Sequence, residues 1–173
     1  WLLALYLAVR NVRRIDFKHY TIITACMLAG LPFGMYLFRS QDTSSLSIIL
    51  AVFIVLVSVS QLYRLVRKQE QGGLPQGKRA LPYYALLVLG GIVHGLFSSG
   101  GPLVVLYATR ALPDKGSFRA TLCLLWTTLN TIIIATYIGE GSLDQGTLKT
   151  TALLIPFVVV GVVIGERVHD RVD

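Results

Sequence analysis

The chain alternates between long apolar runs and short charged segments. Strands are not expected, because the runs are long and lack the two-residue alternation of a half-buried strand. Four runs have about the 20 residues that one transmembrane helix requires. The apolar runs cover residues 1–9, 20–38, 46–63, 81–109, 120–138 and 147–165, and the second, third, fifth and sixth of them have this single-span length. The pattern predicts an all-α, multi-pass bundle of transmembrane helices.

The run 81–109 is different, because it holds 29 residues without Asp, Glu, Lys or Arg and is interrupted by Ser98-Ser99-Gly100-Gly101-Pro102. Glycines remove side chains and permit backbone conformations that a helix does not use. Proline suits the first turn of a new helix. We therefore expect one helix to end at Phe97 and a second to begin at Pro102, which makes this run a broken helix.

The distribution of Lys and Arg tests how the broken run is placed in the membrane. If the run crosses the membrane once, the charged segments put 10 and 6 basic residues on the two sides. If it dips in and returns, the same segments give 14 and 2. Cytoplasmic segments of membrane proteins collect Lys and Arg, so the count favours a re-entrant pair of half-helices. Non-helical backbone at that depth is tolerated only against protein or a water-filled cavity.

Composition agrees with a membrane protein. Hydrophobic residues make up 54% of the chain and charged residues 14%, with a mean hydropathy of +0.65, whereas a soluble domain carries about 25% charged residues. The net charge of +7 is attributed to cytoplasmic segments and not to nucleic-acid binding. Cys26 and Cys123 are interpreted as small packing residues. No nucleophile–base pair, metal cluster or cofactor motif is found, so we expect no enzyme and no cofactor.

Two Gly-x-x-x-Gly pairs suggest an internal repeat. Gly30/Gly34 and Gly161/Gly165 each lie late in an apolar run, and the favoured topology gives these runs opposite directions. Inverted repeats are a common plan of secondary transporters, although such glycine pairs also serve ordinary helix packing. We expect residues 1–63 to form most of a first repeat, 64–80 a cytoplasmic linker and 81–173 most of a second. The chain starts inside an apolar run, and we expect it to be part of a longer protein.

The stretch "GGIVHGLFSSGGPLVVLYATRALPDKGSFRATLCLLWTTLNT" resembles the second-half signature of the TauE/SafE family, the sulfite and sulfonate exporter-like permeases. Residues 10–38 also resemble the basic loop and following helix of that family. The resemblance implies a multi-pass permease of the bacterial inner membrane that moves a small sulfur-containing or organic anion. The chain departs from the family pattern at Ser98-Ser99, where glycine is frequent, and at His94, where a small residue is frequent. It also lacks the family's first glycine-rich helix and its last helix.

An anion is held most simply by the positive end of a half-helix with free backbone N–H groups. A histidine inside the membrane is a candidate for anion contact or proton coupling. Arg110 and Arg119 are expected to concentrate anions at the cytoplasmic mouth. The predicted substrate-binding residues are His94, Ser98, Ser99, Gly100, Gly101, Pro102, Thr127 and Asn130.

Each candidate has a structural alternative. The break is alternatively a kink filled by a neighbouring helix, and His94 a neutral side chain bonded to a backbone carbonyl. Thr127 and its neighbours are alternatively bonded to carbonyls of their own helix. Topology alone accounts for the two arginines.

The function expected from these features is secondary transport of a small anion by alternating access. The alternatives are an anion channel that uses the same half-helix, or a membrane enzyme or assembly subunit without transport. The expected partners are the small anion and the lipid bilayer, with proton coupling open and without nucleic acid. The sequence leaves the oligomeric state open.

Overall fold

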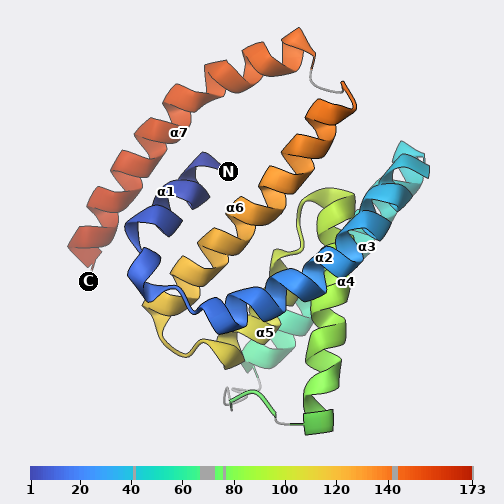
Figure 1. The fold of residues 1–173 in the computed structure, drawn as a ribbon, viewed down its shortest axis with the longest axis vertical. Helices are drawn as coiled ribbons and strands as arrows, with labels where there is room; N and C mark the ends of the chain where they lie inside the picture. The colour runs from blue at the N-terminus through green and yellow to red at the C-terminus, as the bar shows by residue number, and fades with distance from the viewer. Residues whose placement is uncertain (41, 67–72, 76, 142–143, 173) are drawn as a thin grey trace.

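A computed structural model describes residues 1–40, 42–66, 73–75, 77–141 and 144–172, and all regular structure in these residues is helical (Figure 1). This confirms the all-α prediction. The α-helices are α1 (Leu2–Arg10), α2 (Phe17–Ser40), α3 (Thr43–Val66), α4 (Leu81–Phe97), α5 (Gly101–Ala111), α6 (Lys115–Gly139) and α7 (Gln145–Val172), and the 3-10 helices are η1 (Val12–Arg14) and η2 (Gly77–Ala80).

Three helices of the described residues are long and apolar enough to cross a membrane: α2, α6 and the Gln145–Val162 part of α7. The Ser44–Ser60 part of α3 and the whole of α4 are shorter apolar helices. The predicted apolar runs are therefore helical. The break in the run 81–109 is confirmed, with α4 ending at Phe97 and α5 beginning at Gly101, one residue before the predicted start.

The four long helices α2, α3, α6 and α7 begin in the same way. An aspartate carboxylate precedes each of them and accepts a hydrogen bond from the backbone N–H three residues later, which satisfies one of the donors left free in a first helical turn. The pairs are Asp16–His19 (3.0 Å), Asp42–Ser45 (3.0 Å), Asp114–Ser117 (2.6 Å) and Asp144–Thr147 (2.8 Å).

The tightest contact between helices joins α2 to α4, and glycine makes it close. A side chain at Gly30 or Gly34 would overlap the backbone of Val88 or Ile92 on α4, and one at Gly91 or Gly95 would overlap the backbone of α2. Small residues let two helix backbones approach in this way. In contrast, nothing in the described part of the chain lies within 4 Å of a side chain added at Gly161 or Gly165. The two pairs that suggested a repeat therefore have different surroundings here, and the inverted repeat stays a prediction.

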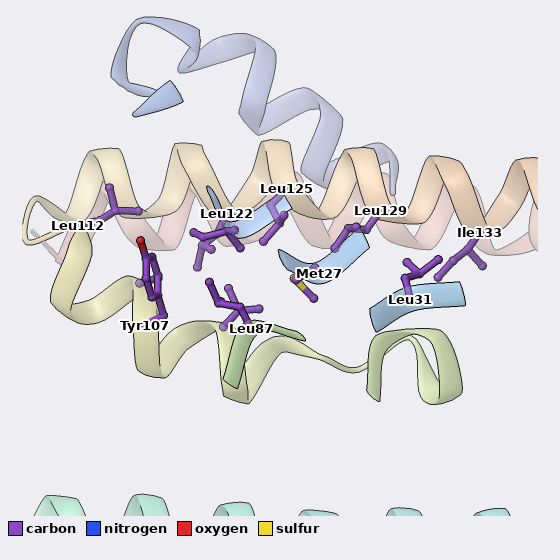
Figure 2. Close-up of a cluster of buried hydrophobic side chains, with 12 residues drawn as sticks. Met27, Leu31, Leu87, Tyr107, Leu112, Leu122, Leu125, Leu129 and Ile133 are labelled. Carbon is purple, nitrogen blue, oxygen red and sulfur yellow. The ribbon is translucent and has the colours of Figure 1, made fainter. Parts of the chain in front are cut away.

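One apolar core joins α2, α4, α5 and α6. Figure 2 shows Met27 and Leu31 of α2, Leu87 of α4, and Leu125 of α6 converging on it, with Tyr107 of α5 at one edge. These side chains are at most 3% exposed. The core thereby fixes α4 and α5 against the middle of α2 and α6.

Helix α5 folds back along α4. Near the break, a side chain at Gly90 would lie 3.5 Å from Leu103, whereas farther away the rings of Tyr84 and Tyr107 are 6.2 Å apart. At the end opposite the break, called the open end of the hairpin, the Arg110 guanidinium lies 5.3 Å from the ring centre of Tyr83. The chain therefore enters and leaves this α4–α5 hairpin at the same end of the molecule.

Four of the charged segments meet in pairs at two ends of the described structure. The Asp16 N–H donates to the hydroxyl of Thr121 (3.0 Å), so the starts of α2 and α6 lie together at the open end of the hairpin. At the other end, Arg39 forms an ion pair with Glu140. The re-entrant placement of the hairpin in a membrane stays a prediction.

The remaining helices are more exposed. α7 and α1 enclose an apolar groove of about 290 Å³, which lies away from the hairpin (Figure 1). Of the predicted linker 64–80, residues 67–72 and 76 lie outside the described residues, and the division into two repeats stays a prediction.

Candidate functional site

The break between α4 and α5 is made by one unusual backbone conformation and one very close contact. Ser98 ends α4 in the left-handed region (φ 52°), and its N–H donates to the carbonyl of His94 (2.7 Å). Gly100 has an ordinary φ of −69°. A side chain at Gly100 would overlap the carbonyl oxygen of Gly90 and lie 3.1 Å from the Met27 methyl group. The expectation that glycine supplies the unusual conformation is therefore wrong here, because glycine is needed for space and serine takes the strained position.

Helix α5 begins without a side-chain cap. Its N-cap residue is Gly100, and Pro102 in the first turn has no N–H to donate. Val104 N–H reaches the Gly100 carbonyl at 3.4 Å, which is longer than a normal bond. Within the described residues, the N–H groups of Gly101 and Leu103 have no acceptor. The positive end of α5 therefore has two free donors.

His94 lies beside this uncapped end. Its side chain is 1% exposed, and a carbon added at Gly100 would lie 3.0 Å from the His94 Cβ. In the part of the chain that the structure describes, neither Nδ1 nor Nε2 has a hydrogen-bond partner. The alternative in which His94 bonds a backbone carbonyl is thus not the arrangement found. Buried polar atoms are normally paired, so two unpaired ring nitrogens indicate a missing partner.

Trp126 connects His94 to the start of α5. The two ring centres are 5.4 Å apart and the rings are inclined by 34°. On its other side, the indole Cζ2 lies 3.8 Å from a side-chain carbon placed at Gly101. The sequence did not decide whether Trp126 packs or lines a site, and its place is at the break. Met27 of α2, which the sequence did not single out, is the second neighbour.

The two serines form the outer side of the break. Ser98 and Ser99 are exposed, whereas Gly100 is buried and Gly101 and Pro102 are half-buried. Hydroxyl groups therefore lie on the accessible side of the uncapped helix and His94 on the buried side. Six of the predicted residues therefore lie together at the break, and their role in binding stays a prediction.

Thr127 and Asn130 use their donors within α6. The Thr127 hydroxyl donates to the Cys123 carbonyl (2.8 Å), and the Asn130 amide donates to the Trp126 carbonyl (2.8 Å). This is the structural alternative considered for such residues. Asn130 keeps its amide oxygen and a second amide hydrogen for another partner.

Three other hydroxyls of α6 hold the N-terminal segment in place. Thr121 accepts from the Asp16 N–H, the Thr128 hydroxyl lies 2.9 Å from that of Tyr20, and Thr131 accepts from the Trp1 indole (2.7 Å). These hydroxyls attach α1 and α2 to α6 and do not face the break.

The two predicted mouth arginines lie at the open end of the hairpin. Arg110 is half-buried against Tyr83, and Arg119 is exposed on the first turns of α6. Nine residues of α5 separate Arg110 from Gly101, which corresponds to about 14 Å along a helix. Neither arginine contacts the break, so any effect on an anion there acts through long-range charge.

The break can therefore hold a small anion in one way. Backbone N–H groups would bind it on the α5 side, and an imidazole N–H would bind it on the α4 side. The serine hydroxyls would complete the contacts. A tetrahedral anion with three outward oxygens matches donors that converge from several directions.

Comparison with known proteins places the chain in a family. The family model described as sulfite exporter TauE/SafE matches residues 2–173. The chain is 26% identical over 166 residues to a probable inner membrane transporter protein, TsaS, of Comamonas testosteroni, covering 94% of this chain and 66% of the relative. It is 28% identical over 80 residues to a probable sulfite/organosulfonate exporter, TauE, of Cupriavidus necator, covering 46% of this chain and 31% of that relative.

No solved structure matches the chain. The chain spans slightly less than two thirds of the TsaS relative. The family match nevertheless extends over almost every residue, and three described helices have the length and apolarity to cross a membrane. The chain belongs to the sulfite exporter TauE/SafE family of membrane proteins.

Proposed function

We propose that the protein is a secondary transporter of the bacterial inner membrane that moves a small anion, such as sulfite or a sulfonate, by alternating access. Family membership supports transport, and the names of the two relatives suggest the substrate class and the membrane. In this proposal the α4–α5 hairpin enters the membrane from the cytoplasmic side and returns to it. The shared end of the hairpin and the grouping of basic segments at that end support this placement.

The observation that carries the proposal is the uncapped start of α5 beside a buried, unpaired histidine. Free N–H groups in a membrane interior are costly unless they have a partner. An anion is the partner that both the helix dipole and an imidazole N–H favour. We assign Gly101 and Leu103 to the binding of its oxygens through their backbone, and Ser98 and Ser99 to contacts through their hydroxyls.

Transport also needs the site to open. His94 is 1% exposed, and Trp126 and Met27 pack against the break. In this proposal Trp126 and Met27 close the site toward one side of the membrane. The site opens when the hairpin moves relative to α6 and α2, which is the rocking of one element against another that alternating access requires.

The binding site is tested by thermal unfolding of the intact purified protein with sulfite, thiosulfate, methanesulfonate, sulfoacetate and simple carboxylates. We expect at least one sulfur oxyanion to raise the Tm of the wild type. Gly101→Leu would push a side chain against Trp126 and cover the free N–H groups, so the stabilisation should disappear. Gly161→Leu is the matched control, because the described residues leave open space there, and it should keep the response.

Two results would contradict the proposal. One is a wild type that no anion stabilises, and the other is an equal response in Gly101→Leu. Flux measurements then separate carrier from channel: a carrier saturates and shows counterflow, whereas a channel gives currents that follow the driving force. An enzyme would instead consume the anion.

A further inference from the structure

We infer that His94 takes up a proton together with the anion, so that proton and anion cross the membrane as a neutral pair. The inference rests on the proposed anion site and adds a proton gradient as the driving force of transport. It starts from the two ring nitrogens of His94, both of which lack a hydrogen-bond partner in the described part of the chain.

A neutral imidazole has one N–H donor and one nitrogen acceptor, whereas the protonated ring has two donors and no acceptor. An anion at the start of α5 presents only acceptor oxygens. A neutral His94 can satisfy one of its nitrogens on such an anion and leaves the other unpaired. The protonated ring directs one N–H to the anion and the other away from it, and its positive charge compensates the charge of the anion.

The described helices around His94, α2, α4, α5 and α6, carry no Asp or Glu that could serve as a fixed counterion. Its contacts are Trp126 of α6 and Gly100, next to Met27 of α2, and none of these groups titrates. The packed helices carry other titratable or charged groups, and none of those described is hydrogen-bonded to either ring nitrogen. These groups are Lys18, His19, Tyr20, Cys26, Tyr36 and Arg39 on α2, Tyr83 and Tyr84 on α4, Tyr107 and Arg110 on α5, and Lys115, Arg119, Cys123 and Tyr137 on α6.

Without a counterion, each charge is unfavourable alone. A buried imidazolium without an anion, or a buried anion without a cation, bears the full cost of leaving water. When both are present, each charge compensates the other, so binding of the anion favours the proton and binding of the proton favours the anion to the same degree. The indole face of Trp126 adds a favourable contact for the protonated ring.

The proton step is a simple transfer. The nitrogen lone pair of neutral His94 accepts a proton from water on the side to which the site is open, and the anion binds beside it. After the site opens to the other side, the anion leaves and the same N–H bond releases its proton to water there. No other bond forms or breaks, and the site returns neutral and empty.

His19 offers a matched comparison. Its Nδ1 lies 3.1 Å from the Tyr107 hydroxyl, and the side chain is half-buried at the start of α2, far along the hairpin from the break. His19 therefore has a partner, and His94 has none. A protonation role is expected of His94 only.

The test uses proteoliposomes of the intact protein with an internal pH dye, and a potassium gradient with valinomycin to hold the membrane potential. Methanesulfonate is the probe, because it is fully ionised and carries no proton itself. We expect its entry to acidify the interior with one proton per anion. Entry without acidification would overturn the inference and leave the proposed transport intact, whereas absence of entry would count against both.

Variants then assign the proton to a residue. His94→Gln keeps a hydrogen-bonding side chain but cannot titrate, so we expect methanesulfonate entry to slow and the anion that does enter to bring no proton with it. His19→Gln should acidify like the wild type. Acidification by His94→Gln at the wild-type ratio would overturn the assignment to His94. If that variant does not fold, the dependence of wild-type influx on an inward pH gradient decides: a tenfold proton gradient should concentrate methanesulfonate about tenfold, and no concentration would overturn the coupling.

Discussion

The start of α5 differs from the starts of the four long helices in the same chain. α2, α3, α6 and α7 each have an aspartate carboxylate that accepts a backbone N–H of the first turn. α5 has Gly100 at its N-cap and no side-chain acceptor. The electrostatic requirement is the same at all five ends, because the first N–H groups of a helix carry partial positive charge.

The difference is between a permanent and an exchangeable hydrogen-bond partner for the first N–H groups of a helix. A carboxylate on the chain stabilises a helix end permanently. At α5 the close contact of Gly100 with Gly90 leaves no space for such a side chain. The free N–H groups there can be satisfied by an anion that comes and goes, which is what a transporter requires.

The largest effect is expected when α4 loses its contact with α2, because this contact holds the α4–α5 hairpin in place. Gly91→Leu places a large side chain against the Met27 backbone, so we expect little or no folded protein in size-exclusion chromatography. The matched control Gly165→Leu, on an open part of α7, should fold normally. Equal yields of the two variants would show that the α2–α4 contact does not fix the hairpin.

A carboxylate placed next to α5 should remove the difference between the two kinds of helix start. Ser99→Asp puts a negative charge beside the free N–H groups, and we expect methanesulfonate affinity to fall at least tenfold, about 1.4 kcal/mol. Ser99→Asn, which has the same size without the charge, should retain most of the affinity. Titration calorimetry measures both, and an unchanged affinity in Ser99→Asp would place the anion elsewhere.

Removal of a permanent cap should affect stability without affecting the anion. Asp114→Ala deletes the carboxylate that accepts the Ser117 N–H, and loss of such a cap costs about 1 kcal/mol. We expect a lower Tm with an unchanged shift on addition of methanesulfonate. A reduced shift would mean that the start of α6 takes part in binding.

The smallest effect is expected from acid pH, which protonates the aspartates that cap the helices. Hydrogen bonds from Ser45 and Thr147 lower the pKa of Asp42 and Asp144 below its usual value. Because the folded pKa is the lower one, these carboxylates stabilise the protein above the unfolded pKa of about 3.9, and this contribution is lost as pH falls through the folded pKa. The double variant Asp42→Asn and Asp144→Asn should lose less Tm than the wild type between pH 5 and pH 3. Parallel curves would contradict this role.

The sequence was a good guide to features with local causes. The apolar runs predict the helices, and the segment from Ser98 to Pro102 predicts the break, because proline suits the first turn of a new helix. The division of basic residues puts residues 10–19 and 110–119 on one side of the membrane, which stays a prediction, and the Asp16–Thr121 bond joins the starts of α2 and α6. These signals do not depend on knowing which helices touch.

Features that depend on contact between distant segments could not be read from the sequence. Trp126 and Met27 reach the break only because α6 and α2 pack on the hairpin. The Gly30/Gly34 pair looks like Gly161/Gly165 in sequence, yet only the first contacts another described helix. The Thr127 hydroxyl and one Asn130 amide hydrogen donate to carbonyls of their own helix, a choice that residue type alone does not make.

The location of the anion tests the central claim most directly. Selenite is a heavy analogue of sulfite, and its selenium can be located by anomalous diffraction from crystals of the intact protein. The account predicts a selenium peak at the break, with oxygens in hydrogen-bond range of the Gly101 and Leu103 N–H groups and of one His94 nitrogen. A protein that binds selenite in solution but shows its peak elsewhere, with the start of α5 still empty, would contradict the account.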